Sequence, residues 1–214
     1  MNNMKAFIFD LDGVIVSTDS LHYRAWKALA DSEGIYFDEE INNRLRGVSR
    51  MESLEIILER ATRTYTDEEK VAMAEKKNGI YRELLQVLTP SDRLAGVTET
   101  LDALRAKGYK LAIGSSSKNT PIILEKIGYS GYFDAISDGN NIKNSKPDPE
   151  VFLKAAEFLQ LQPSECFVVE DAEAGITAAK AGGFTAIGIG SAAEDPNADY
   201  AIQTFADFLN IANG

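Results

Sequence analysis

Cysteine, histidine and long hydrophobic segments are scarce or absent in this sequence. The 214 residues include one cysteine, Cys166, so no disulfide can form within the chain, and we expect Cys166 to be a small buried residue. There is no run of about eighteen apolar residues that would predict a membrane-spanning helix. The first residues, MNNMKAFIFD, also lack the apolar stretch and cleavage site of a signal peptide. These absences predict a cytoplasmic protein without a membrane partner.

Positive charge is the other scarce property. Lysine and arginine together number 22 against 33 aspartates and glutamates, which gives a formal net charge of -11. Because nucleic-acid binding requires a basic face that neutralises phosphates, we expect no nucleic-acid partner. An anionic substrate would have to be bound by a few local cations. The hydrophobic content of 44% is enough for the core of one domain, or of one domain that carries an insert.

The hydrophobic pattern separates a helical segment from the rest of the chain. Residues 5–9 predict a short buried strand, whereas apolar residues between about 17 and 85 recur at intervals close to 3.6, which is typical of helices. Two capping boxes, in which a hydroxyl and a carboxylate bind free amides of a helix's first turn, are predicted at Ser49 with Glu52 and at Thr66 with Glu69. The segment therefore predicts a helical insert after the first strand.

After the insert, helices alternate with short apolar strands. Helices are expected over 97–107, 120–127, 149–160 and 173–182, and strands at KLAIG, CFVVE and TAIGIG. Such alternation predicts a parallel sheet covered by helices. The fold class is thus α/β, with a Rossmann-like, doubly wound parallel-sheet core at residues 1–15 and 87–214. The inserted helical domain is expected at residues 16–86.

Polar side chains follow three predicted strands of the core and also lie in one loop. Asp10, Asp12 and Gly13 follow the first strand, the turn from Ser115 to Asn119 follows KLAIG, and Glu170 with Asp171 ends CFVVE, while Lys146 with Pro147 lies in the loop before the helix at 149. Because ligands of such sheets bind beyond the carboxyl ends of the strands, we expect these groups to meet at one edge. Clustered carboxylates repel one another unless a cation lies among them, and oxygen ligands next to a phosphate suit Mg²⁺.

A magnesium ion held by Asp10, the Asp12 carbonyl and Asp171 would allow Asp10 to stay ionised and attack phosphorus. Asp12 could then act as general acid and base on the oxygen that leaves or attacks. Each short motif taken alone also fits an ordinary turn, helix start or strand end. The order and spacing of all four favour a catalytic site.

Four motifs resemble those of the haloacid dehalogenase superfamily of aspartate-dependent phosphotransferases: FIFDLDGV, GSSSKN, SKPDP and VVEDAEAGI. The resemblance implies that Asp10 is the phosphorylated nucleophile and Asp12 the acid and base, with the transferring phosphoryl oxygens held by Ser115 and Lys146. It further implies that Glu170, directly or through water, joins the other ligands of Mg²⁺. The helical insert resembles the cap domain of superfamily members.

Other segments resemble the sugar-phosphate mutases of that superfamily: HYRAWKALA, LRGVSRMESL, KKNGIY, SSSKNTP and GYFDAI. This resemblance implies that sugar phosphates are the substrates, and that β-glucose 1-phosphate and glucose 6-phosphate are interconverted. It implies β-glucose 1,6-bisphosphate as the intermediate and priming activator. An unbroken apolar stripe is absent from the helices, so we expect a monomer.

The same resemblance implies a set of substrate-binding residues in the cap and in the core. From the cap these are His22, Trp26, Gly47, Val48, Ser49, Arg50, Lys77 and Asn78, and from the core Ser116, Ser117, Lys118 and Asn119. Arg50 also has independent support, because the Ser49 capping box places it in the first helical turn, where the dipole favours an anion. Leu45 also matches a cap position that faces the substrate in the mutases, but both Trp26 and Leu45 fit the cap's hydrophobic core equally well.

Ser17 departs from the mutase pattern, which commonly has aspartate at this position of the hinge.

Three classes of function remain open. The first is the magnesium-dependent mutase, and the second is a small sugar-phosphate or phosphoglycolate phosphatase with the same core. The third is a non-enzymatic switch that accepts phosphate on Asp10, and the large insert counts against it.

Overall fold

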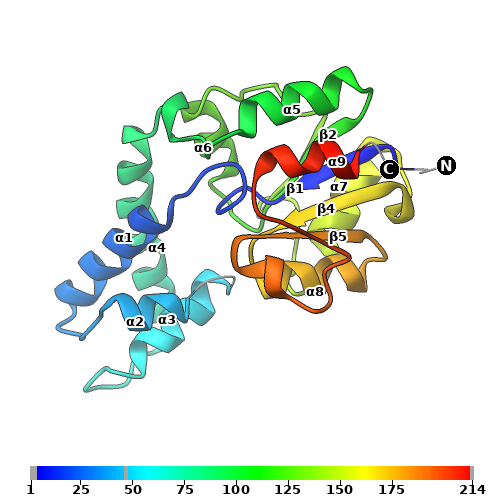
Figure 1. Ribbon diagram of the computed structural model, residues 1–214. Coiled ribbons are helices and arrows are strands. Elements are labelled where there is room, and N and C mark those ends of the chain that lie inside the picture. Colours follow the sequence, from blue (N-terminus) through cyan, green and yellow to red (C-terminus); the bar gives the residue numbers. More distant parts are fainter. Residues whose placement is uncertain (1–3, 46–47, 213–214) are drawn as a thin grey trace. The chain divides into compact units, whose positions relative to one another are not determined.

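The computed structural model describes residues 4–45 and 48–212. Two compact units make up the chain: one comprises Met1–Ser17 and Thr89–Gly214, and the other comprises Thr18–Leu88 (Figure 1). We call the first the core unit and the second the cap unit.

The core unit contains a six-stranded parallel sheet in the order β3-β2-β1-β4-β5-β6. The strands are β1 (Ala6–Phe9), β2 (Lys110–Gly114), β3 (Ala135–Ser137), β4 (Cys166–Glu170), β5 (Thr185–Ile189) and β6 (Tyr200–Ile202). The first strand, β1, pairs with both β2 and β4 and is buried at all four residues, as expected for a central strand covered on both faces. The fold class predicted from the sequence is confirmed.

Helices cover the two faces of this sheet. They are α5 (Val97–Ala106), α6 (Thr120–Lys126), α7 (Glu150–Leu159), α8 (Glu173–Ala181) and α9 (Phe208–Ile211). Helices α7 and α8 pack on the face that carries Ala6 and Ile8. On the opposite face, Phe7 and Phe9 contact Phe208 of α9, with ring centroids 5.9 and 6.0 Å apart. Alternate residues of β1 thus serve separate hydrophobic layers.

Among the described residues of the cap unit, the regular elements are helices joined by short loops. Its helices are α1 (Asp19–Ser32), α2 (Glu39–Asn43), α3 (Arg50–Leu58) and α4 (Asp67–Leu84). They enclose a separate hydrophobic core that includes Trp26, Leu29, Leu54, Ile57 and Met73. Both predicted capping boxes are present at the starts of α3 and α4.

Short 3-10 turns occur in both units. They lie at Leu85–Val87, Pro90–Asp92, Pro163–Glu165, Gly190–Glu194 and Phe205–Asp207.

Two strands were not predicted from the sequence, β3 and β6. Each has three residues, which is too short for an alternating pattern to be recognised.

Cys166 is fully buried in β4, as expected, and burial raises the pKa of its thiol to about 12. Among the described residues, no helix is both long and apolar enough to cross a membrane.

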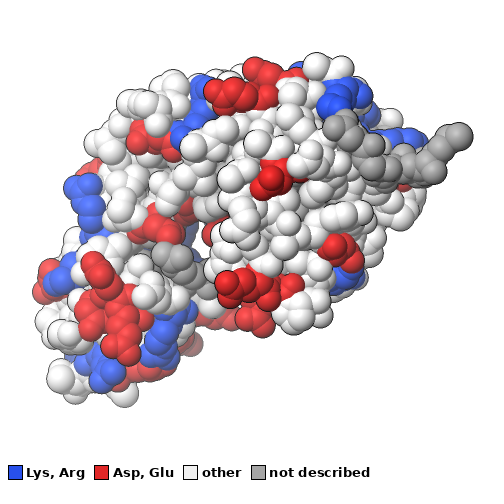
Figure 2. Space-filling view, in the orientation of Figure 1, with Lys and Arg blue, Asp and Glu red and all other residues white. Residues whose placement is uncertain are grey.

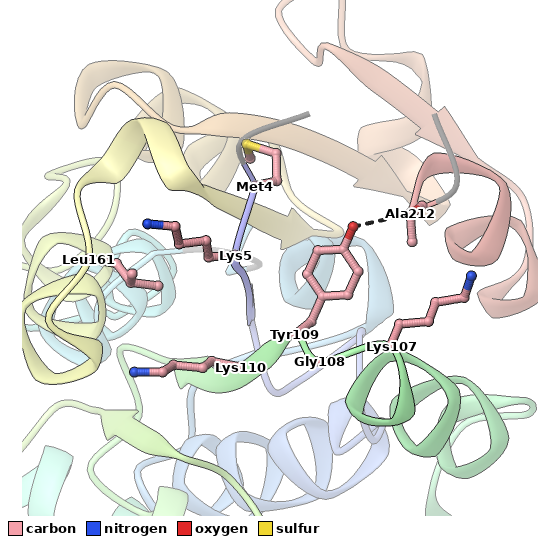
Figure 3. Close-up of a pocket in the computed structure, with 8 residues that line it drawn as sticks. All are labelled: Met4, Lys5, Lys107, Gly108, Tyr109, Lys110, Leu161 and Ala212. Carbon is pink, nitrogen blue, oxygen red and sulfur yellow. Dashed lines mark hydrogen bonds between the residues drawn. The ribbon is translucent and has the colours of Figure 1, made fainter. Parts of the chain in front are cut away.

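The surface shows the excess of acidic residues. On the face drawn in Figure 2, acidic side chains are spread widely and basic ones lie among them singly or in small groups. Three lysines, Lys5, Lys107 and Lys110, line a pocket of about 540 Å³ together with Tyr109, and the Lys107 side chain extends away from the other two (Figure 3). This pocket lies at the amino-terminal ends of β1 and β2, and the predicted site residues follow the opposite ends of the strands.

Candidate active site

The candidate active site is built at the carboxyl-terminal edge of the central strands of the core unit. Asp10 directly follows β1, Ser115 directly follows β2, and Glu170 is the last residue of β4. Because β1 lies between β2 and β4, these residues project from three neighbouring strands. Asp10 is held in register by its backbone N–H, which donates to the carbonyl of Val169 at 2.9 Å. The topology therefore brings together residues far apart in the sequence.

Three carboxylates cluster at this edge. One oxygen from each of Asp10, Glu170 and Asp171 lies within 4.8 Å of the others. The ammonium group of Lys146 donates to Asp10 Oδ1 at 2.5 Å and also to Glu170 Oε1. Lys146, Asp10 and Glu170 are almost fully shielded from solvent, with side-chain exposures of 8%, 11% and 2%. A single lysine thus faces more negative charge than it can neutralise.

The pKa values of these groups reflect that imbalance. Burial, with repulsion from Asp10, raises the pKa of Glu170 to about 7 despite the attraction of Lys146. Burial, with repulsion from Asp10, Glu170 and Asp12, raises the pKa of Asp171 to about 8. Burial alone would lower the pKa of Lys146, but the carboxylates of Asp10 and Glu170 outweigh it, and the pKa is raised. The carboxylate cluster is therefore short of positive charge.

This donor set fits a magnesium ion. All the clustered ligand atoms are carboxylate oxygens, which hard divalent cations prefer, and an added cation would relieve the repulsion that raises the two pKa values. Asp10, Asp171 and Glu170, three of the four predicted ligands, are brought together. The fourth, the backbone carbonyl of Asp12, stays a prediction.

Two glycines allow the acidic groups to approach the backbone. Gly13 has a positive φ of 90°, and a Cβ there would lie 2.0 Å from Asp171 Oδ2. A Cβ on Gly175 would lie 2.1 Å from Glu170 Oε1. Any side chain at either position would therefore displace a carboxylate of the cluster. Gly13 was singled out from the sequence, whereas Gly175 was missed because only its contact with Glu170 reveals its role.

The turn from Ser115 to Asn119 follows β2 and is held by its own hydroxyl groups. The N–H of Ser117 donates to Ser115 Oγ at 3.2 Å, and that of Asn119 donates to Ser117 Oγ at 3.1 Å. The Ser116 hydroxyl accepts from the backbone N–H of Lys146 at 3.4 Å. Ser115 and Asn119 are buried, whereas Lys118 is exposed. This arrangement connects the turn to the segment that carries Lys146.

The remaining predicted residues lie in the cap unit. Ser49 is the N-cap of α3: its Oγ accepts from the Glu52 N–H at 3.3 Å, and its own N–H donates to Glu52 Oε2 at 2.9 Å. Arg50 is the first residue of the helix and forms an ion pair with Glu75 at 3.2 Å. Val48 is exposed. Gly47 falls outside the described residues.

A second cap group surrounds Lys77, which is 3% exposed. Its ammonium lies 2.9 Å from His22 Nδ1 and 4.7 Å from the centre of the Trp26 ring. His22 stacks on Tyr81, with ring centroids 4.1 Å apart. Burial, together with Lys77 and Arg50, lowers the pKa of His22 well below its ordinary value of about 6.5. The imidazole is therefore neutral, and its Nδ1 accepts from the lysine.

The sequence interpretation missed Tyr81. Its hydroxyl lies 2.8 Å from Thr18 Oγ1, and its ring also lies 4.6 Å from the Lys77 ammonium. The available signal was its position four residues after Lys77, which places both side chains on one face of α4. Asn78, also on α4, is partly exposed, and Trp26 belongs to the hydrophobic core of the cap unit.

Known proteins resemble this chain over nearly its whole length. A β-phosphoglucomutase from Bacillus subtilis is 43% identical over 206 residues, which cover 95% of this chain and 91% of the relative. A crystal structure of β-phosphoglucomutase from Clostridium difficile matches with a TM-score of 0.90 and 40% identity, over 98% of this chain and 96% of that one. A phosphorylated carbohydrates phosphatase from Thermotoga maritima is 33% identical, over 86% of this chain and 84% of the relative.

The family model of the haloacid dehalogenase-like hydrolases matches residues 4–183. That range includes the strand ends that carry Asp10, Ser115 and Glu170, as well as the inserted cap unit. This chain therefore belongs to the haloacid dehalogenase-like hydrolase family.

Proposed function

We propose that this protein is a magnesium-dependent β-phosphoglucomutase, which interconverts β-glucose 1-phosphate and glucose 6-phosphate through β-glucose 1,6-bisphosphate. The observation that carries the proposal is the cluster of Asp10, Glu170 and Asp171 around Lys146, in a chain 43% identical to a β-phosphoglucomutase. The alternative is a sugar-phosphate phosphatase. It is less favoured because the phosphatase relative is 33% identical to this chain, whereas the mutase relative is 43% identical.

In the proposed reaction, Asp10 carries the phosphoryl group between the two ends of the sugar. The C6 hydroxyl of β-glucose 1-phosphate attacks the phosphorus on Asp10, the bond to the Asp10 oxygen breaks, and the hydroxyl proton passes to Asp12. The resulting bisphosphate turns over, and Asp10 attacks the phosphorus at C1. Asp12 returns the proton to the leaving C1 oxygen, which releases glucose 6-phosphate and restores the phosphorylated Asp10.

Lys146 and Ser115 are proposed to hold the oxygens of the transferring phosphoryl group. The Lys146 ammonium already contacts the Asp10 carboxylate, so it would stand beside the phosphorus that Asp10 attacks. Magnesium bound by Asp10, Glu170, Asp171 and the Asp12 carbonyl would neutralise charge on the phosphoryl oxygens and on the nucleophile. Both groups of interactions act on charge that spreads over the phosphoryl group during transfer.

The second phosphate distinguishes a mutase from a phosphatase. A mutase must exclude water from its phosphorylated aspartate until the sugar is bound, and recognition of a second phosphate supplies that condition. We assign this recognition to Arg50 in the cap unit and to Ser117, Lys118 and Asn119 in the core unit. In the ion pair of Arg50 with Glu75, the glutamate side chain is 68% exposed to solvent. Because exposed ion pairs contribute little free energy, Arg50 could leave Glu75 and bind a phosphate at little cost.

The other cap residues have proposed roles in the same recognition. His22, held by Lys77, would help to position Asp12, while Trp26, Val48, Ser49, Asn78 and Gly47 would contact the sugar or shape its surroundings. We further propose that the enzyme acts as a monomer in the cytoplasm and that β-glucose 1,6-bisphosphate primes it. The residue roles and the priming rest on the resemblance of the motifs to the mutases. The monomer rests on the absence of an unbroken apolar stripe, and the cytoplasmic location on the absence of membrane-span and signal-peptide patterns.

Substitution of Arg50 tests this function. We expect Arg50→Ala to lower kcat/KM for β-glucose 1-phosphate at least about 100-fold, since it removes a charge-assisted contact to a phosphate. Phosphorylation of Asp10 by acetyl phosphate, which has no second phosphate, should change less than about threefold. Arg44→Ala is the matched control, because Arg44 is also a cap arginine paired with a glutamate, Glu59 at 2.8 Å. Equal losses in both reactions would contradict the assignment of Arg50.

A further inference from the structure

A four-residue segment after β3, Asp138–Asn141, packs against the turn that carries Ser115 and Lys118. The two segments extend neighbouring strands, since Gly114 of β2 pairs with Ser137 of β3. Beyond this pair, the N–H of Ser115 donates to the Ser137 carbonyl at 3.0 Å. We call Asp138–Asn141 the bracing segment. No motif of the sequence points to it, and the reaction described above does not use it.

Gly139 brings the backbone of the bracing segment against the backbone of the turn. Its N–H donates to the Ser117 carbonyl at 3.2 Å. A Cβ at this position would lie 2.4 Å from the Ser116 carbonyl oxygen and 2.8 Å from the Lys118 nitrogen. Both are backbone atoms that cannot rotate away, so the absence of a side chain permits the close packing. The backbone of Gly139 therefore packs directly against the backbone of the turn and holds it in place.

Asn140 supplies a second contact through its side chain. Its Nδ2 donates to the carbonyl of Lys118 at 3.0 Å. The asparagine is itself held in place, because its backbone N–H donates to Asp138 Oδ1 at 2.8 Å and the Asp138 carboxylate belongs to a buried residue. The Asn141 side chain accepts from the Asp138 N–H at 3.3 Å and from the Ser137 hydroxyl at 3.0 Å. The segment thus presents a preorganised amide to the turn.

We propose that Asn140 is a positioning residue, which fixes the backbone of Lys118 so that its ammonium meets the second phosphate of the sugar bisphosphate. This inference rests on the proposed function, in which Lys118 binds that phosphate. Lys118 is exposed and its side chain is long, so its backbone anchor limits the space that the ammonium explores. Holding the carbonyl reduces the conformational entropy that substrate binding would otherwise remove. Asn140 thus increases the affinity for the sugar phosphate without contacting it.

The position of the contact makes the effect selective. Ser115, which is assigned to the transferring phosphoryl group, is tied to β3 through the Ser137 carbonyl and to the turn through Ser117. Those hydrogen bonds do not involve Asn140. Loss of the Asn140 amide should therefore loosen Lys118 and leave Ser115 and Asp10 in place.

The test compares Asn140→Ala with the unsubstituted protein in three measurements: the Kd for glucose 6-phosphate by calorimetry, the KM for β-glucose 1-phosphate, and the rate of Asp10 phosphorylation by acetyl phosphate. We expect Kd and KM to rise about fivefold, which corresponds to about 1 kcal/mol for one hydrogen bond, with the phosphorylation rate unchanged within about twofold. Asn140→Asp is the second variant, because its carboxylate has the same shape and cannot donate. Asn144→Ala, in the same exposed connection, is the matched control.

The outcomes separate this inference from the proposed function. Unchanged Kd and KM in both Asn140 variants would overturn the inference alone, as would an equal loss of Asp10 phosphorylation, which indicates a general structural role. An unsubstituted protein that binds glucose 6-phosphate without isomerising β-glucose 1-phosphate would contradict the proposed function alone. If the unsubstituted protein fails to bind glucose 6-phosphate at all, both are wrong.

Discussion

Three acidic residues of the candidate active site lie close together although their charges repel one another. Glu170 is buried, the adjacent Asp171 is partly buried, and both lie close to Asp10, so the ionised forms of Glu170 and Asp171 are unfavourable unless cations are present. Lys146 is a compact point charge and supplies part of the compensation. The clustering has a chemical use, because carboxylates that are short of positive charge attract a metal cation, and the bound cation would in turn attract the oxygens of a phosphoryl group.

The single histidine of the chain offers a test at the same scale. The folded-state pKa of His22 lies well below the value of about 6.5 expected in the unfolded chain, so the unfolded chain binds a proton more readily. The stability that neutral His22 permits is complete above about pH 7 and is lost as the pH falls below about 6.5. Urea unfolding at pH 7.5 and 5.5 measures it.

We expect the unsubstituted protein to lose about 1 kcal/mol more than His22→Gln between these two pH values, because glutamine does not titrate. The many carboxylates titrate in both proteins and cancel in the difference. Identical pH dependence in the two proteins would show that His22 is not held neutral by Lys77 and its surroundings.

At the scale of elements, two helices of the cap unit each begin with a capping box and therefore form a matched pair. In α3, Ser49 and Glu52 form the capping box, and in α4 Thr66 and Glu69 form it, with the Thr66 N–H donating to Glu69 Oε2 at 2.8 Å. Only the α3 box is directly followed by a residue assigned to the substrate, Arg50. Both boxes should stabilise their helices similarly, but they should differ in their effect on activity.

Ser49→Ala and Thr66→Ala should each lower the free energy of unfolding by about 1 kcal/mol, the usual cost of a lost N-cap. Only Ser49→Ala should also raise the KM for β-glucose 1-phosphate, by about threefold to tenfold, because the first turn of α3 orients Arg50 and Ser49 is itself assigned to the sugar. Chemical denaturation and steady-state kinetics on the pair check this expectation. A KM that rises equally in both variants would mean that general loosening of the cap, and not the start of α3, controls binding.

Much of the element order could be predicted from the sequence because its signals are local. The buried run of β1, the strands β2, β4 and β5, and the capping boxes all appear within a few neighbouring residues. The three-residue strands β3 and β6 carry no such pattern. Site residues that directly follow strands were predictable for the same reason, since topology alone brings Asp10, Glu170 and Asp171 together.

The missed residues act through contacts between distant parts of the chain. Gly175 matters because a carboxylate from the preceding strand occupies the space of its absent Cβ. Asn140 contacts a carbonyl 22 positions away, and Tyr81 contacts Thr18 across 63 positions. No spacing rule in one sequence identifies such partners, because each depends on the final packing of two elements.

At the scale of the whole molecule, magnesium binding should be coupled to stability. A ligand that binds only the folded state stabilises it by about 2.7 kcal/mol at a concentration a hundredfold above its Kd, which is about 5 to 10 °C in Tm for a chain of this size. We expect this shift in the unsubstituted protein and its loss in Asp171→Asn. Thermal unfolding with and without Mg²⁺ measures both.

Asp12→Asn is the control for that experiment, because it keeps the backbone carbonyl assigned to the metal and removes only the carboxylate assigned to proton transfer. It should retain the shift and lose turnover. If Asp171→Asn shows the same Mg²⁺-dependent shift as the unsubstituted protein, the metal binds elsewhere.

In the proposed reaction, a sugar hydroxyl, and not water, attacks the phosphorylated Asp10. The most direct measurement mixes the protein with Mg²⁺, β-glucose 1-phosphate and a trace of β-glucose 1,6-bisphosphate, and follows glucose 6-phosphate and inorganic phosphate in one sample, with Asp10→Asn as control. We expect glucose 6-phosphate without a matching amount of inorganic phosphate, and neither product with Asp10→Asn. Inorganic phosphate without glucose 6-phosphate would contradict it and would make the protein a phosphatase.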